Sequence, residues 1–158
     1  MSIWRPHTTR IVIGGLVAIL IALVASYAYS HFQPTTEVRI ASGVFQVKLA
    51  NTEPARLQGL SGVDKMSAND GLLMVYDTDA QHGIWMKDMK IPIDIIWLDK
   101  DKKVIFIVTD AAPELGETKT YKPRSAARFV LEIPAGMVKK SAIKIGDVAT
   151  FELTEEAL

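Results

Sequence analysis

The chain of 158 residues contains no cysteine. This absence excludes disulfides, thiolate metal sites and cysteine nucleophiles together. The chain also lacks an excess of charge of either sign, because 18 lysines and arginines are balanced by 18 aspartates and glutamates. A balanced charge offers no general attraction for a polyanion. We therefore expect no nucleic-acid partner.

Catalytic and cofactor-binding motifs are also lacking. The sequence contains no Gly-x-Ser-x-Gly elbow, no His-Glu-x-x-His pair and no glycine-rich phosphate loop. It has three histidines, and His82 is the only one beyond residue 31, so a histidine-rich metal centre is excluded within one chain. These absences favour a protein that is not an enzyme and has no cofactor.

Charge is absent from the run Ile11–Tyr29, "IVIGGLVAILIALVASYAY". A helix over this run would be about 28 Å long at about 1.5 Å per residue, close to the hydrocarbon thickness of a bilayer. Arg5 and Arg10 precede the run, and the next lysine or arginine is Arg39. The positive-inside rule then predicts a cytoplasmic N-terminus and an extracytoplasmic C-terminal part.

Two interpretations of this segment remain open. A retained anchor makes the protein a single-pass protein of the inner or plasma membrane, with residues 11–29 in the bilayer. A cleaved signal makes it a secreted protein, and Ser26 and Ala28 have the small side chains that signal peptidase accepts. Both interpretations divide the chain into a signal or anchor (1–30), a linker (31–36) and a β-rich domain (37–158).

Short strands are predicted in the rest of the chain. In "VFQVKLA", residues 44–50, apolar and polar side chains alternate as in a strand with one buried face. "IDIIWLDKDKKVIFIVTD", residues 93–110, reads as a β-hairpin around a charged turn. In "ARFVLEIPAG", residues 127–136, the pattern predicts a strand with Arg128, Val130 and Glu132 facing outward.

Helical signals are few. Asn51 or Thr52 can cap a short helix that contains Pro54 and ends at Gly59. A second short helix can begin at Pro134, and a last strand is expected within residues 143–153. The stretch 111–125 has no periodicity and predicts a long surface loop. We therefore expect a compact, mainly β domain, an antiparallel β-sandwich or barrel of jelly-roll type with one or two short helices.

Four blocks of sequence, read in order, resemble the uncharacterised family called domain of unknown function number 192. They are "EPARLQGLSG", "DGLLMVYD", "HGIWMKDMKIPIDIIWLD" and "ARFVLEIPAGMVKKSAIKIGD". The resemblance covers about residues 44–153. It implies a compact β-rich fold of jelly-roll or sandwich type, often exported, with no established activity. Where the family commonly has asparagine and threonine, this chain has Asp88 and Met89, and it lacks the paired cysteines of some relatives.

A binding edge is the main candidate site. Lys87 and Asp94 flank an Ile-Pro pair, and a proline in a sheet belongs at a strand start or an edge, where backbone groups can remain available to a ligand. His82 precedes them on the same stretch. Arg128 lies on a strand that can neighbour it, and Tyr121 is the exposed aromatic candidate of the long loop.

Alternative roles for polar and sulfur-containing residues remain open. An enzyme could use Lys87, Asp94 and Arg128 around one pocket. A copper carrier could use His82, Met86 and Met89, although a regular strand would not bring all three together. Arg56 has equally good structural and functional roles. Glu132 is expected to form an ordinary surface ion pair.

The sequence thus predicts an exported, membrane-tethered module that binds a small polar ligand, a glycan or an envelope protein. The predicted contacts are His82, Lys87, Asp94, Arg128 and Tyr121. No resident metal is expected.

Overall fold

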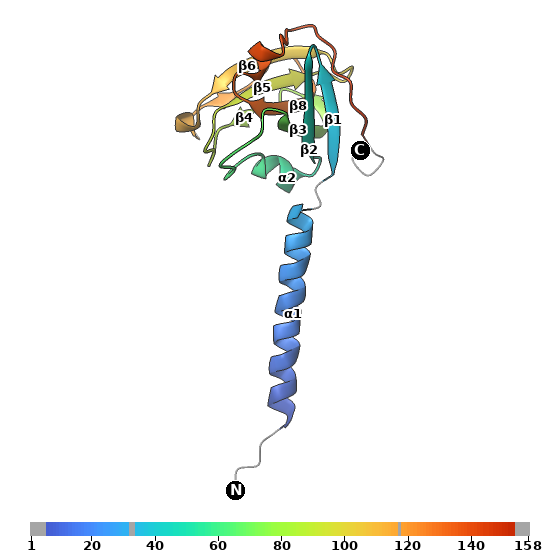
Figure 1. The fold of residues 1–158 in the computed structure, drawn as a ribbon, viewed down its shortest axis with the longest axis vertical. Helices are drawn as coiled ribbons and strands as arrows, with labels where there is room; N and C mark the ends of the chain where they lie inside the picture. The colour runs from blue at the N-terminus through green and yellow to red at the C-terminus, as the bar shows by residue number, and fades with distance from the viewer. Residues whose placement is uncertain (1–5, 32–33, 117, 154–158) are drawn as a thin grey trace. The chain divides into compact units, whose positions relative to one another are not determined.

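The computed structural model describes residues 6–31, 34–116 and 118–153 (Figure 1). The predicted linker residues 32–33, and the chain ends 1–5 and 154–158, lie outside the described residues. The chain forms two compact units, Met1–Gln33 and Pro34–Leu158.

The first unit contains the helix α1, Pro6–His31. Its large apolar side chains from Val12 to Val24 are exposed. None of the helices formed by the described residues is both long and apolar enough to cross a membrane. The membrane-spanning helix predicted over residues 11–29 is therefore not supported.

The second unit is built on one six-stranded sheet (Figure 1). In spatial order its strands are β1 (Thr35–Ile40), β2 (Gly43–Ala50), β3 (Asp70–Ala80), β8 (Ala127–Pro134), β5 (Ile93–Leu98) and β6 (Val104–Ala111). β2 and β3 are parallel and the other pairs are antiparallel. The mainly β prediction is confirmed, but the sheet is mixed and the described strands do not close into a barrel. The predicted hairpin is the pair β5 and β6.

A second, two-stranded sheet pairs β4 (Ile84–Trp85) with β7 (Thr120–Tyr121). The predicted surface loop 111–125 is therefore partly structured. It also contains a 3₁₀ turn at Pro113–Leu115.

The parallel step from β2 to β3 passes through the short helix α2, Glu53–Gln58. The Thr52 hydroxyl accepts a hydrogen bond from the Ala55 N–H, and Pro54 occupies the first turn. Gly59 ends the helix at a φ of 51°, a conformation that glycine tolerates best. These capping signals were read correctly from the sequence. Another short helix, α3, spans Met137–Lys140.

Both faces of the main sheet are buried. One apolar cluster contains Phe45, Leu73, Leu131 and Ile133. A second contains Met74, Trp97, Val130 and Ile84, so it lies on the opposite face of the same strands. This is why every residue of β5 is buried. The prediction that Val130 and Glu132 face solvent is wrong, because the second cluster covers that face.

The C-terminal segment contacts both edge strands. Arg39 of β1 forms a bridge with Thr150, and Lys103 beside β6 forms one with Val148. The predicted last strand exists only as these two isolated bridges. Ala149, between the two bridging residues, and Phe151, after them, are buried in the first apolar cluster.

Candidate functional site

A cavity of about 400 Å³ lies beside α2. Volumes of this order are typical of small-molecule sites. Its walls are mainly apolar, with a few polar groups from α2, β3 and β8. Its lining includes the side chains of Arg56, Leu57, Leu60, Met74, Tyr76, Trp85, Met89 and Glu132. We call it the Glu132 cavity.

Glu132 lies in the middle of β8, between Leu72 of β3 and Ile95 of β5. Its side chain is buried, and Oε2 has no hydrogen-bond partner among the described residues. Burial raises the pKa of Glu132 to about 8, because the charged form loses its hydration. The carboxyl is therefore mostly protonated at neutral pH, and a proton on Oε2 would have no acceptor among the described residues.

Arg56 is held by the backbone. Its Nη1 donates to the Asn51 carbonyl at 2.7 Å and to the Val75 carbonyl at 2.8 Å. Its guanidinium carbon lies 4.9 Å from the centre of the Tyr76 ring, within cation–π range. Both bonds use Nη1, and the guanidinium carries three further N–H donors on Nε and Nη2.

Tyr76 of β3 also lines the cavity. Its hydroxyl donates to the Met74 sulfur at 3.5 Å. Burial, and to a smaller extent Glu132, raise the pKa of Tyr76 to about 12, although Arg56 acts in the opposite direction. The phenol therefore stays neutral. The His82 ring stacks on it with centroids 3.5 Å apart and planes at 9°, forming a stack of Arg56, Tyr76 and His82.

His82, a predicted ligand contact, thus supports Tyr76. Its Nε2 lies 3.0 Å from the Thr78 carbonyl, and its own carbonyl accepts a hydrogen bond of 2.8 Å from Trp97 Nε1. Burial lowers the pKa of His82. His82 is not among the residues that line the Glu132 cavity.

Lys87 and Asp94 do not share a site. Lys87 lines a separate depression beside Pro54 and Asp88, and its Nζ lies 5.3 Å from the centre of the Trp85 ring. Asp94 is fully buried, and its two oxygens accept hydrogen bonds from the backbone N–H groups of Asp110 at 2.9 Å and Val138 at 2.8 Å. Asp94 therefore joins β5 to the end of β6 and to α3.

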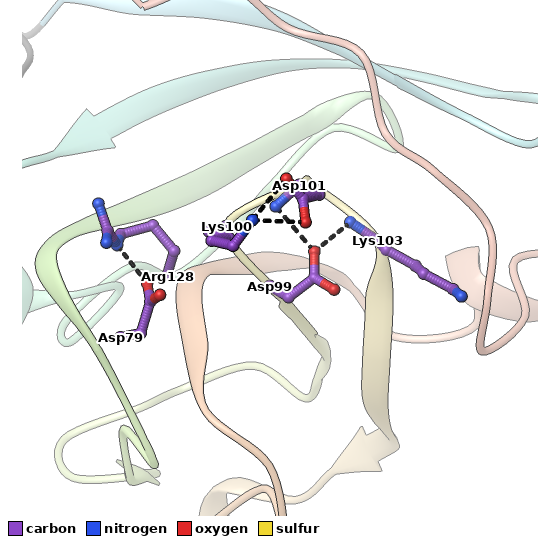
Figure 2. A network of polar contacts seen from close by, with 6 residues as sticks. All are labelled: Asp79, Asp99, Lys100, Asp101, Lys103 and Arg128. Atoms are coloured by element: carbon purple, nitrogen blue, oxygen red, sulfur yellow. Dashed lines mark hydrogen bonds and ion pairs between the residues drawn. The ribbon is translucent and has the colours of Figure 1, made fainter.

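Arg128 is engaged elsewhere. Its Nε lies 2.6 Å from the Asp79 carboxylate, as Figure 2 shows. In the β5–β6 turn of the same view, Asp99 accepts backbone hydrogen bonds from Asp101 and Lys103.

Tyr121 is only 9% exposed and pairs with Ile84 across β7 and β4. Its prediction as an exposed aromatic was wrong, because β7 packs it into the second cluster.

The residues of the copper hypothesis have separate roles. Met86 is fully buried in the second cluster, Met89 lines the Glu132 cavity, and His82 stacks on Tyr76. Within residues 6–31, 34–116 and 118–153, no three histidine or acidic side chains are placed to hold a metal ion.

The sequence interpretation missed Glu132 and Tyr76. A signal did exist, because Glu132 is the one acidic residue within the apolar run "FVLEIP". Single-face alternation placed it outward, whereas the strand has neighbours on both edges and apolar layers on both faces.

The model of the DUF192 family, described as "Uncharacterized ACR", matches residues 36–151. The chain belongs to the DUF192 family. Its relatives include the UPF0127 protein TK1120 of Thermococcus kodakarensis, 31% identical over 111 residues that cover 70% of this chain and 68% of the relative. The family resemblance seen in the sequence is thereby confirmed.

Two solved structures share the fold. One, from Novosphingobium aromaticivorans and of unknown function, has a TM-score of 0.68 and 26% identity, and the match covers 75% of this DUF192 chain and 84% of the other. The second, from Sinorhizobium meliloti and provisionally named a transcription regulator, has a TM-score of 0.72 and 24% identity, with coverages of 80% and 97%. At that identity the second likeness shows the fold alone.

Replacing Asp94 tests its structural role. We expect Asp94→Ala to lower the free energy of unfolding by about 2–4 kcal/mol, because two backbone N–H groups lose their acceptor. Asp64, whose exposed carboxylate pairs with Lys90 at 2.9 Å, provides the control, and Asp64→Ala should cost less than about 0.5 kcal/mol. Urea denaturation measures both. Equal stability of the two variants would contradict the assignment.

The raised pKa of Glu132 predicts how stability depends on pH. The unfolded chain releases this proton near pH 4.5 and the folded chain near pH 8. The contribution of Glu132 is therefore fully present below the lower value and is lost as pH rises to the higher one. Relative to Glu132→Gln, the natural chain should lose stability over this range at up to about 1.4 kcal/mol per pH unit.

Urea denaturation at each pH gives this slope, and Glu114→Gln, at an exposed position, should leave it unchanged. If Glu132→Gln has the same slope as the natural chain, Glu132 does not titrate in this way.

Proposed function

We propose that the second unit is a non-catalytic module that binds a small molecule in the Glu132 cavity. The observation that carries this proposal is the buried, unpartnered Oε2 of Glu132 at the wall of a cavity of about 400 Å³. A buried polar group without a partner costs about 1–3 kcal/mol. Such a cost is expected where a ligand supplies the missing hydrogen bond.

The cavity wall favours binding over catalysis. It offers one buried acid and one arginine, whereas covalent catalysis needs a nucleophile in contact with a base. Ser61, which also lines the cavity, donates its hydroxyl proton to the Lys87 carbonyl at 2.8 Å. The enzyme hypothesis based on Lys87, Asp94 and Arg128 loses its geometric support, because these side chains do not line a common cavity in the described residues.

Methionine labelling can locate a ligand. The full-length chain with ¹³C-methyl methionine should show shifts of the Met74 and Met89 methyl signals with compounds from a metabolite library, because both residues line the cavity. Leu57 is 61% exposed and also lines it. Leu57→Trp should weaken these compounds about tenfold or more, because the indole occupies the opening.

Ile145 is 66% exposed and does not line the cavity, so Ile145→Trp is the matched control and should leave affinities unchanged. Compounds that shift only Met137, or that bind both variants equally, would contradict a site in the cavity.

We propose separately that the second unit is exported. Support comes from the charge-free run 11–29 that follows Arg5 and Arg10. The exposed apolar side chains between Val12 and Val24 also favour an environment other than water for α1.

A periplasmic-type reporter enzyme fused after Leu158 tests the export. It should be active with the full chain and inactive when residues 1–30 are deleted. The size of the fusion protein then distinguishes a cleaved signal from a retained segment. An inactive reporter in both fusions, with the fusion proteins found in the cytoplasm, would contradict export.

A further inference from the structure

We propose that the Glu132 cavity binds the carboxylate of a small organic acid with an apolar body, with Arg56 and Glu132 as its two hydrogen-bond donors. This inference rests on the proposed function and adds the chemical class of the ligand. The neighbouring side chains, the charge of the cavity and its apolar walls support it in turn.

The protonation state of Glu132 favours a ligand group that accepts a hydrogen bond. A protonated carboxyl presents an O–H, and Oε2 has no partner in the described part of the chain. Its cross-strand partners, Leu72 on β3 and Ile95 on β5, are apolar, and Met74 lines the same cavity. A ligand oxygen that bears negative charge makes the strongest hydrogen bond with such a donor.

Arg56 provides the second donor. Its Nη1 is fixed by two backbone carbonyls, so the guanidinium is already oriented before a ligand arrives. Its remaining N–H groups form the planar fork that matches a carboxylate. Both donors act on the same neighbour, because Arg56 lowers the pKa of Tyr76 and Glu132 raises it.

Charge argues against a cationic ligand. Arg56 is the cationic side chain among the residues that line the cavity, so an ammonium group bound there would meet a like charge. The acid on α2, Glu53, also lines the cavity but is exposed, so solvent screens its charge. Tyr76 on β3 and His82 beside β4 are neutral at neutral pH, because burial raises the pKa of the first to about 12 and lowers that of the second.

The apolar walls indicate the chemistry of the rest of the ligand. Leu60, Met74 and Ile84 are buried side chains of the apolar wall, and Trp85 is 41% exposed at the opening. Such walls favour a carbon skeleton such as a phenyl ring or a short alkyl chain. Glycans, which are polar on all sides, fit this lining less well.

Three probes of one shape separate the alternatives: phenylacetate, phenylacetamide and phenethylamine. Each is titrated into the full-length chain while the Met74 and Met89 methyl signals are followed. At pH 7 we expect phenylacetate to bind about tenfold or more tightly than the amide, and the amine to bind most weakly. If phenylacetamide or phenethylamine binds most tightly, the inference of a carboxylate ligand is wrong, but the proposed function as a binding module stands.

The pH profile gives a second, independent result. Phenylacetate stays ionised above pH 6, so its affinity should fall by up to about tenfold per pH unit once Glu132 ionises above about 8. Glu132→Gln keeps an N–H donor and cannot ionise, so its affinity should be within about threefold of the natural value at pH 7 and flat above pH 8. An unchanged fall in this variant would contradict the role of Glu132.

Arg56→Met tests the second donor. It should weaken phenylacetate about tenfold or more and phenylacetamide by less than about threefold, because only the anion uses the cation. The melting temperature is measured alongside, since Arg56 also holds two backbone carbonyls. If this variant unfolds, the Glu132→Gln profile decides. If none of the probes shifts Met74 or Met89 at about 10 mM, the proposed function fails with the inference.

Discussion

Burial of the main sheet on both faces is the constraint on which the rest of this structure depends. β8 and β5 have a hydrogen-bonded neighbour along each edge and an apolar cluster on each side. Any polar side chain in the middle of these strands is therefore removed from water. Asp94 meets this constraint by accepting two backbone hydrogen bonds. Glu132 meets it by losing its charge, and the same loss of charge turns it into a hydrogen-bond donor.

The elements that cover the second apolar cluster leave a cavity beside Glu132. α2, β4 and β7 cover the second cluster without filling the space beside Glu132, and the cavity is what remains. His82 and Tyr121, which the sequence predicted as ligand contacts, pack against other residues of the second unit. His82 stacks behind Tyr76, Tyr121 anchors β7, and Trp97 holds the backbone at His82. Arg56, for which structural and functional roles were equally good, has the structural role, since its Nη1 holds two backbone carbonyls. The functional role is the one that we propose for its other nitrogens.

Membership of the DUF192 family places the chain among proteins described as uncharacterised, and the fold recurs in solved bacterial structures. A shared fold does not transfer a function. The proposal of binding therefore depends on particular groups of this chain, above all a buried acid and a backbone-held guanidinium that line one cavity. An apolar cavity alone would suit many ligands, whereas these two donors restrict the choice to an acceptor-rich head group.

The sequence alone determined the features that depend on neighbours along the chain. The cap at Thr52 and the stop at Gly59, the alternation of β2 and the β5–β6 hairpin follow from local backbone chemistry and were predicted correctly. The family also followed from short blocks of residues. Only the tertiary structure decided the parallel pairing of β2 with β3, the burial of Glu132 and Tyr121, and the separation of Lys87 from Asp94. The reason is that burial of a strand residue depends on what covers each face, and that cover comes from segments distant in sequence.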